Sequence, residues 1–408
     1  MVTARTDHKA PVLILAYVYP PDNYAGAARP HRFAKYLERL GHPVTIVAAG
    51  PPGATSAAGN VYRVPGELEG RHKTLADKVV RLAWLYYDEG VAWIPGVVRL
   101  AARWRDLRPV LFSTSPPITT HLAALWLKRR YGWKWMADFR DPLAGNPFRK
   151  LRRVQYSDAV LEKIIFRQAD TLIANTDSVE ALWRRRYPHW GRKIALIWNG
   201  FDAEDPAGGA PIPPREFRVL AHAGEIYGDR HPGLVLASVA RLTAQGSIQP
   251  GKLRIQLVGP VAQEALPEAA LVEGLTRCGC LEMKPAAVPR AEAQRLTAEA
   301  DQLLLLDVLS GSAGLQVPGK IFDYIRIGRP VLASTTRGSP AERILEQSGI
   351  PHGCIYPDLG EPEIDRRVLE FLKLPSTPVA PSAWFQSQFD AARQAEALSD
   401  LIQALSRG

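Results

Sequence analysis

The sequence predicts an α/β protein built from two doubly wound domains, each with a parallel sheet. Short apolar runs alternate with amphipathic stretches along nearly the whole chain, which is the pattern of repeated βαβ units. This alternation pauses once, in a stretch rich in Gly, Pro and Asp at residues 198–217, and then resumes. The length of 408 residues also favours two domains, because single hydrophobic cores stop growing at about 250–300 residues.

The first half of the chain contains six short apolar runs that are typical of buried parallel strands. They are residues 11–17, 43–49, 110–114, 133–138, 171–175 and 193–198. Helical patterns are predicted between them, at residues 27–40, 74–88, 117–131, 152–168 and 178–187. The first of these helices is expected to stop at Gly41, since Pro43 follows just beyond it.

The second half repeats the same pattern after the pause. Strands are predicted at residues 218–224, 253–259, 279–283, 302–307, 330–335 and 353–357. The main helices are expected at residues 233–244, 290–300, 318–327 and 339–348. A closing helix is predicted from about residue 382 to residue 406, after a loop with three prolines. The expected domains are therefore residues 1–199 and 200–382, followed by the closing segment 383–408.

The cysteine content and the lengths of the apolar runs indicate in which cellular compartment the protein is expected. The three cysteines are too few and too irregular for a disulfide framework, and the C-G-C motif alone is not a zinc site. The apolar runs fall short of the roughly 18 residues that a spanning helix needs. The first run ends in Pro-Pro without a small-residue cleavage site, so it is interpreted as a strand and not as a signal peptide. A reducing cytoplasm is expected.

Charge is distributed unevenly between the two halves. Residues 1–199 carry 31 Lys and Arg against 16 Asp and Glu, whereas the remainder carries 20 against 25. The basic half could face nucleic acid, anionic lipid or a phosphorylated substrate. Nucleic acid is the weakest of these interpretations, because no recognised binding module is present.

Residues 71–109 are the candidate for contact with an anionic membrane surface. They mix Lys and Arg with Trp84, Tyr86, Tyr87, Trp93 and Trp104. Cationic amphipathic stretches with aromatic residues can lie in the headgroup region, which would place the protein at the inner face of the cell membrane. The alternative is a pair of helices that pack on the sheet and leave a solvated basic rim.

Open parallel sheets bind ligands outside the carboxyl ends of their strands, so the loops there are candidate sites. In the first half, Gly26 lies in a long loop that precedes a helix, where small residues would let an anion approach the backbone. That loop could equally be an ordinary surface loop. Asp138 ends another strand, close to Arg140 and Asp141. It could meet a substrate hydroxyl, or it could belong to an internal ion pair.

The second half has two such loops. Gly224 makes a flexible turn after the first strand, and Arg230 follows where it could bind a diphosphate. Gly319 and Lys320 open a short helix, with Asp323 one turn further on. Arg230 could be merely solvated, and Lys320 with Asp323 could be a surface ion pair. A cation at the positive end of a helix is unfavourable for the dipole, so an external anion explains Lys320 better.

These loops, taken in order, resemble those of family 4-type bacterial glycosyltransferases. The resemblance rests on "YPPDNYAGAARPHRFAKYLERLGHPVTIV", "ADFRDP", "IANTDSVEALWRRRYP", "WNGFD", "HAGEIYGDR" and "VPGKIFDYIRIGRPVLA", and it covers roughly residues 11–405. It implies the GT-B fold, in which two Rossmann-like domains face each other across a cleft and the C-terminal helix returns to the N-terminal domain. It also implies retaining transfer of a sugar from a nucleotide-sugar, with no metal and no cofactor.

The resemblance assigns roles to the candidate residues. Arg230 and Lys320 would bind the diphosphate of a UDP- or GDP-linked donor, and Asp323 would bind its ribose. The glycine loop at Gly26 would approach the donor phosphates, and Asp138 would face the transferred sugar. Gly224 and Gly319 would belong to the donor site. The acceptor would be a saccharide or a lipid-linked saccharide, in assembly of envelope polysaccharide or exopolysaccharide.

Two positions depart from the family pattern. Leu315 stands where many members have a sugar-contacting acid, and Glu225 stands where an arginine usually follows the glycine. Two alternatives therefore remain. One is a sugar-nucleotide epimerase or hydrolase of the same fold, and the other is a catalytically silent carbohydrate-binding subunit.

Overall fold

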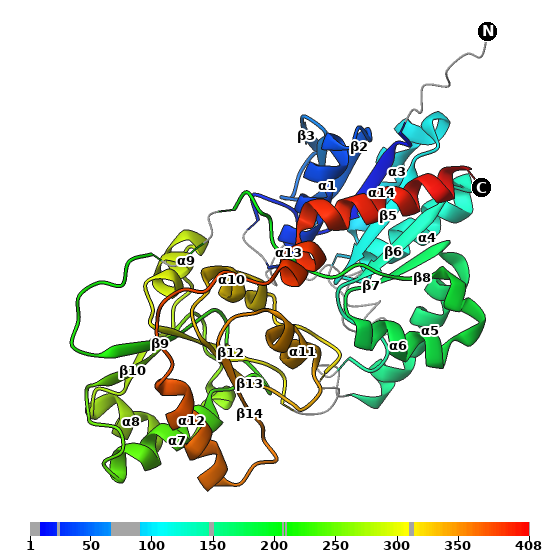
Figure 1. Cartoon of the computed structure of the whole chain (residues 1–408). Coiled ribbons are helices and arrows are strands. Elements are labelled where there is room, and N and C mark those ends of the chain that lie inside the picture. The colour runs from blue at the N-terminus through cyan, green and yellow to red at the C-terminus, as the bar shows by residue number, and fades with distance from the viewer. Residues whose placement is uncertain are drawn as a thin grey trace. The chain divides into compact units, whose positions relative to one another are not determined.

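The computed structural model describes residues 9–22, 25–66, 90–146, 151–205, 208, 210–309 and 314–407. The chain divides into two compact units. Unit 1 comprises Met1–Asp202 with Asp390–Gly408, and unit 2 comprises Ala203–Phe389. Each unit is an α/β structure with its own sheet, as Figure 1 shows, so the predicted fold class is confirmed.

The sheet of unit 1 has eight strands in the order β3-β4-β2-β1-β5-β6-β7-β8. They are β1 Val12–Ala16, β2 Val44–Gly50, β3 Ser56–Ala58, β4 Val61–Pro65, β5 Val110–Ser115, β6 Trp135–Phe139, β7 Thr171–Ala174 and β8 Ile194–Leu196. The strand pairs are parallel except β3 with β4, which is antiparallel. Strands β3 and β4 were not predicted, because β3 is fully exposed at the sheet edge and lacks the apolar run of a buried strand.

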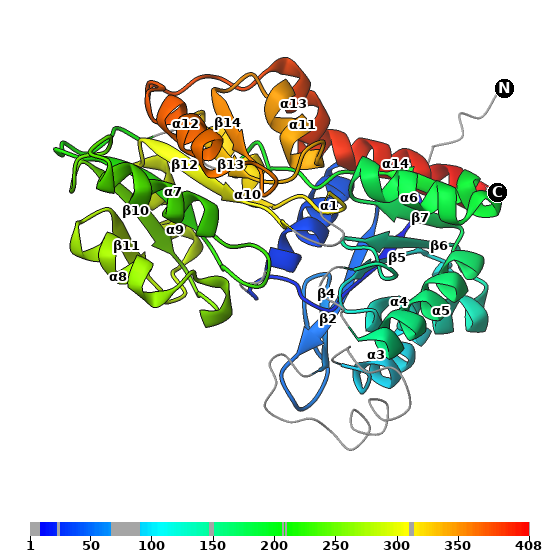
Figure 2. The ribbon, with the colours of Figure 1, turned by 90° about the horizontal axis from the view of Figure 1, so that it is seen from below.

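Helices cover both faces of this sheet. They are η1 Ala25–Ala27, α1 Ala28–Arg39, α3 Trp93–Ala101, η2 Ala102–Leu107, α4 Thr119–Tyr131, α5 Arg152–Gln168, α6 Asp177–Arg186, η3 Pro188–Lys193 and α14 Ala391–Arg407. Helices α1 and α14 pack on one face, where Leu37, Leu398 and Ile402 join the core of the β-strands. Figure 2 shows α3, α4 and α5 on the opposite face. The helix predicted at residues 74–88 lies outside the described residues.

The sheet of unit 2 is parallel throughout, with the strand order β11-β10-β9-β12-β13-β14. Its strands are β9 Arg218–Ala223, β10 Leu253–Val258, β11 Leu281–Lys284, β12 Gln302–Leu306, β13 Val331–Ser334 and β14 His352–Ile355. All six were predicted, with boundaries that differ by a few residues. Because the strands are parallel, their carboxyl ends meet at one edge. That edge carries the loops in which the candidate residues of unit 2 lie.

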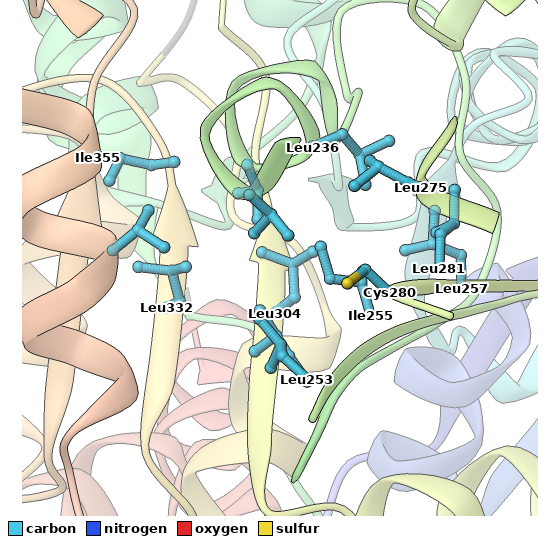
Figure 3. Close-up of a cluster of buried hydrophobic side chains, with 14 of the residues drawn as sticks. Leu236, Leu253, Ile255, Leu257, Leu275, Cys280, Leu281, Leu304, Leu332 and Ile355 are labelled. Atoms are coloured by element: carbon cyan, nitrogen blue, oxygen red, sulfur yellow. The ribbon is translucent and has the colours of Figure 1, made fainter. Parts of the chain in front are cut away.

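The helices of unit 2 also form two layers. They are α7 Gly233–Ala244, η4 Gln263–Ala265, α8 Ala269–Arg277, α9 Arg290–Ala298, α10 Lys320–Ile327, α11 Pro340–Gln347, α12 Glu361–Leu372 and α13 Ala383–Phe389. Helices α7, α8 and α12 cover one face, and α9, α10 and α11 cover the other (Figure 1). Figure 3 shows the core under the first layer, where Leu236 and Leu275 of the helices meet Ile255, Leu257 and Leu304 of the strands. This packing fixes the strand ends that hold the site.

The predicted closing helix is two helices. Helix α13 ends at Phe389 and α14 begins at Ala391, with Asp390 between them. Asp390 forms a β-bridge with Phe201, and the Ala391 N–H donates to the Phe201 carbonyl. The sequence contains neither Gly nor Pro at this point, so the break depends on a contact with a distant residue and leaves no local signal. The boundary between the two units falls at the same place.

No helix within the described parts of the chain combines the length and the apolarity needed to cross a bilayer.

Candidate functional site

Two glycines bring the ends of β9 and β10 very close together. Gly224 follows β9 with a φ of +132°, and Gly259 follows β10 with a φ of +126°. The Gly224 N–H donates to the Val258 carbonyl at 2.7 Å. A Cβ on Gly259 would lie 2.7 Å from the Gly224 carbonyl oxygen. Both the conformation and the space therefore require glycine at these two positions.

Lys320 occupies the space above Gly224. A Cβ on Gly224 would lie 2.2 Å from Lys320 Nζ. Lys320 is the first residue of α10, and Gly319 before it has no atom within 4 Å of where its Cβ would lie. The N-terminus of α10 and an ammonium group therefore share one edge of the sheet with the backbone of Gly224, and together they form a favourable environment for an anion.

A buried histidine holds Lys320 in place. His222 Nδ1 lies 2.9 Å from the Leu304 carbonyl oxygen, and its Nε2 lies 3.2 Å from Lys320 Nζ. Because a carbonyl can only accept, Nδ1 carries the proton and Nε2 is left as the acceptor. Lys320 therefore donates to a neutral imidazole that the β12 backbone has already fixed in one tautomer.

Burial and charge shift the pKa values of this pair in the same direction. Burial, followed by the charge of Lys320, lowers the pKa of His222 well below its ordinary value. Burial, followed by the charge of Arg230, lowers the pKa of Lys320 to about 8, while Glu225 opposes this shift. At neutral pH the histidine is thus neutral and most of the lysine is charged.

Arg230 supplies the second cation of the site. Its Nη1 donates to the Tyr227 hydroxyl at 3.2 Å, its guanidinium lies over the Tyr227 ring, and its Nη2 approaches Gln316 Oε1 at 3.5 Å. The chain turns back at this point, since the Arg230 N–H donates to the Tyr227 carbonyl. Arg230 influences the pKa values of both Lys320 and His222, which places the two predicted phosphate-binding cations in one electrostatic environment.

Helix α10 presents two different sides, as its sequence predicts. Ile321, Phe322 and Ile325 are buried, which confirms the predicted packing side. Asp323 is half-buried and lies one turn from Lys320. Tyr324 ties the helix to the sheet, because its hydroxyl accepts from the Ala223 N–H at 3.1 Å. The helix therefore holds Lys320 and Asp323 in a fixed position beside the end of β9.

Asp138 of unit 1 lies in the interior. It pairs with Arg29 at 2.7 Å, and both side chains are almost wholly buried. Thr114 Oγ1 donates to the same carboxylate at 2.7 Å. Arg29 also donates to the carbonyls of Ile197 and Trp198, so it joins β6 to the segment that follows β8. This geometry favours the internal ion pair over contact with a substrate.

Gly26 makes room for a guanidinium. A Cβ on Gly26 would lie 2.0 Å from Arg140 Nη1. Arg140 in turn donates from Nε to the Ser115 carbonyl at 3.0 Å and from Nη2 to the Pro116 carbonyl. Burial lowers the pKa of Arg140, and the charge of Asp141 opposes that shift. In unit 1, too, a cation lies against a glycine, although Gly26 belongs to η1 just before α1 and does not follow a strand directly.

The described part of the predicted membrane segment does not form the expected aromatic surface. Residues 71–89 lie outside the described residues. Trp93 is completely buried and donates from Nε1 to the Ala48 carbonyl at 3.3 Å. Trp104 is half-buried and packs edge-on against Tyr62. Trp93 in particular is a core residue of unit 1, since its indole fills the space between α3 and the sheet.

Sequence reasoning missed His222, Gly259 and Arg29. His222 had a usable signal, because a histidine within the apolar strand "VLAHA" must find buried partners. Gly259 also ends a predicted strand, as Gly224 does. Arg29 had no signal, since its partners are far away along the chain. No cluster of metal-ligating side chains is found among the residues with described positions.

One family model matches part of the chain. Residues 29–205 match the model of Glycosyltransferase Family 4. This match covers less than half of the chain. Among curated proteins, none matches the sequence. The matched region ends near the boundary between the two units, so the family domain corresponds mainly to unit 1.

Similarity to solved structures extends over both units of the chain. Sucrose-phosphate synthase from Thermosynechococcus elongatus is 14% identical with a TM-score of 0.63, covering 98% of each chain. Anabaena HepE in complex with UDP-glucose is 13% identical with a TM-score of 0.58, covering 98% of this chain and 97% of HepE. An epimerase described as a UDP-N-acetylglucosamine 2-epimerase from Listeria monocytogenes is 11% identical with a TM-score of 0.56, covering 98% of this chain and 97% of the epimerase. The chain has the GT-B fold.

Proposed function

We propose that the protein transfers a sugar from a nucleotide-sugar to a saccharide or lipid-linked acceptor, and that unit 2 binds the donor. The observation that carries this proposal is the position of Lys320, whose Nζ occupies the space above Gly224 and bonds His222. A cation placed against a glycine at a strand end suits a diphosphate, because charge and backbone N–H groups can act on it together. Anabaena HepE, which shares the fold, was solved with UDP-glucose.

The chemistry of transfer explains why two cations are useful. Breaking the bond between the sugar and the phosphate leaves additional negative charge on the nucleoside diphosphate. Lys320, Arg230 and the N-terminus of α10 can stabilise that charge, and such preorganised groups often supply the largest part of catalysis. We propose that these groups do so without a metal ion or a cofactor. Asp323, one turn along α10, would bind the ribose.

We further propose that the anomeric configuration is retained. Asp138 is bonded by Arg29 and Thr114, so its carboxylate is poorly placed to act as a nucleophile. In a same-face reaction, the bond from the anomeric carbon to the phosphate oxygen breaks as the bond to the acceptor oxygen forms. The acceptor's proton passes to the departing phosphate. The resemblance to family 4 supports this step.

The donor site is tested by nucleotide binding. Thermal-shift and calorimetric titrations with UDP, GDP and their sugar conjugates should identify one base that stabilises the protein. Lys320→Met should lose that stabilisation, whereas the surface substitution Lys252→Met should keep it. If every nucleotide leaves the unfolding temperature unchanged, the donor assignment is wrong.

Product analysis separates transfer from the alternatives. A transferase releases nucleoside diphosphate and forms a new glycoside with an extract-derived envelope saccharide or lipid-linked saccharide. An epimerase changes the sugar and a hydrolase needs only water, and the likeness to the epimerase structure makes this control necessary. A silent subunit would bind nucleotide without turnover. Envelope polysaccharide or exopolysaccharide assembly is the proposed setting, to be tested by the identity of the acceptor.

A further inference from the structure

One face of unit 1 is covered by a helical layer with an unusual surface. This α3–α4–α5 layer consists of α3, η2, α4 and α5, which pack side by side on the sheet (Figure 2). Seven large hydrophobic side chains are exposed among the described residues, and six of them belong to this layer or to its helix caps. The six are Leu107, Trp126, Leu151, Tyr156, Val160 and Ile164.

The same layer is strongly basic. Ten of its arginine and lysine side chains are exposed, and its one exposed acid is Asp106. The exposed basic residues are Arg99, Arg103, Arg105, Arg108, Arg129, Arg130, Arg152, Arg153, Lys163 and Arg167. The remaining acids of these helices, Asp158 and Glu162, are buried. Glu162 is bonded internally, to the Ala144 N–H, Arg186 and Tyr187. The surface therefore carries a concentrated positive charge.

Helix α5 shows how the two properties combine. Tyr156, Val160 and Ile164 are four residues apart, so they form one stripe along the helix, with exposures of 61%, 42% and 36%. At 100° per residue, Lys163 and Arg167 fall on the same arc of the helix as this stripe. Apolar and basic side chains are therefore interleaved on one face, and do not form separate patches.

From this we propose that the α3–α4–α5 layer docks on a membrane surface that contains anionic lipid. The apolar stripe would enter the headgroup boundary, while the surrounding Lys and Arg contact lipid phosphates and carboxylates, as long basic side chains do at interfaces. Trp126 of α4 is 46% exposed, and tryptophan is enriched at membrane interfaces. The proposal moves the expected membrane contact from residues 71–109 to α4 and α5, and retains the arginines of α3 and η2.

The composition of the layer favours lipid over other partners. A second copy of the same face would bring ten positive charges against ten, which is repulsive. Nucleic acid would be bound by the basic residues but would leave Val160 and Ile164 without a role. An anionic bilayer uses both kinds of side chain. Docking does not depend on the proposed transfer activity, because it requires neither donor nor acceptor.

The test is vesicle flotation of the full chain. The probes are vesicles of phosphatidylcholine alone and of phosphatidylcholine mixed with phosphatidylglycerol. We expect binding to the mixed vesicles alone, weakening as salt rises. Arg152→Glu, Lys163→Glu and Arg167→Glu together should lower the partition coefficient by roughly 100-fold or more, since each basic residue contributes about 1 kcal/mol near an anionic surface.

Matched variants make the test specific. Arg192→Glu, Arg277→Glu and Lys373→Glu change the net charge equally but lie outside the layer, and they should retain binding. Tyr156→Ser, Val160→Ser and Ile164→Ser together should abolish the binding that remains at high salt. Equal loss in both charge variants, or no binding to the mixed vesicles by the wild type, would overturn the proposal. Binding to RNA with none to vesicles would also overturn it.

Two controls separate this proposal from the catalytic one. Unfolding temperatures of all the variants should stay close to the wild type, because the substituted side chains are exposed. Nucleotide titrations on the same preparations should be unchanged. If the protein floats with vesicles but binds no nucleotide, the docking proposal stands and the proposed function is contradicted. If it binds nucleotide but does not float with vesicles, the docking proposal is contradicted and the proposed function stands.

Discussion

His222 Nε2 lies 3.2 Å from Lys320 Nζ, and the opposite nitrogen of the same ring lies 2.9 Å from the Leu304 carbonyl oxygen. The backbone of β12 thereby determines which ring nitrogen accepts, and this nitrogen determines where the lysine ammonium points. The predicted lysine is thus positioned by a residue that the sequence motifs did not single out.

Removing either cation should abolish most of the transfer activity. Lys320→Ala and Arg230→Ala are each expected to lower kcat/KM by roughly 10²–10³-fold, which is the usual effect of losing one group that stabilises transition-state charge. Release of nucleoside diphosphate measures the rate, and circular dichroism checks that the fold persists. Near-normal rates in both variants would remove these residues from the donor site.

His222 should act through Lys320. His222→Phe removes the acceptor and should weaken nucleotide binding by about 10- to 100-fold, which corresponds to one hydrogen bond to a charged group. His222→Gln can place an amide oxygen near the position of Nε2, so it should recover part of the affinity. Calorimetric titration with the preferred nucleoside diphosphate measures both variants. Equal losses would mean that the imidazole acts by filling space alone.

Nucleotide affinity should fall as the pH rises through about 8. The pKa of Lys320 is lowered to about 8, so the cationic form that attracts phosphate is lost above that value. Because one group titrates, the loss should follow the titration of a single proton. The nucleotide itself changes little there, since the second pKa of a phosphate is about 6. Glu225 raises the pKa of Lys320, so Glu225→Gln should move the midpoint to lower pH. A midpoint that stays fixed in this variant would contradict the electrostatic account.

Gly224 and Gly319 should respond differently to alanine. Gly224→Ala forces a φ of +132° on a residue with a Cβ and brings that Cβ within 2.2 Å of Lys320 Nζ, so it should cost about 1–3 kcal/mol and displace the lysine. Gly319→Ala has open space and an ordinary φ of −56°, so its stability should change little. Denaturant unfolding compares the two. Equal stabilities would show that the loop adjusts freely.

Substitution of Asp138 tests whether this residue has a structural or a catalytic role. Asp138→Asn leaves Arg29 buried without its carboxylate partner, so a loss of about 3–5 kcal/mol in unfolding free energy is expected. Thermal and denaturant unfolding measure this loss. If stability is unchanged while transfer activity disappears, the carboxylate serves the reaction and the internal ion pair is dispensable.

The fold and part of the donor site could be predicted because their signals are local. Buried parallel strands are continuous apolar runs, and the glycine and lysine at 319 and 320 mark a helix start within one short segment. The loops at Gly224 and Lys320 come together because parallel strands place their carboxyl ends at one edge. Topology alone therefore brought the two predicted segments into contact.

The remainder could not be predicted because it depends on contacts between distant residues. The break at Asp390 comes from its bridge to Phe201, and the burial of Asp138 depends on Arg29, which is 109 positions away. The basic and apolar surface of α5 was concealed for a different reason. Its sequence shows Asp158 and Glu162 among the basic residues, and only the structure shows that both acids face inward.

Calorimetric titration of the wild type and Lys320→Met with nucleoside diphosphates, at a pH below 8, tests the central claim most directly. We predict saturable binding of one nucleoside diphosphate by the wild type and a loss of at least tenfold in affinity in the variant. Equal affinity in the two proteins would show that the nucleotide does not bind where Lys320 and Gly224 meet.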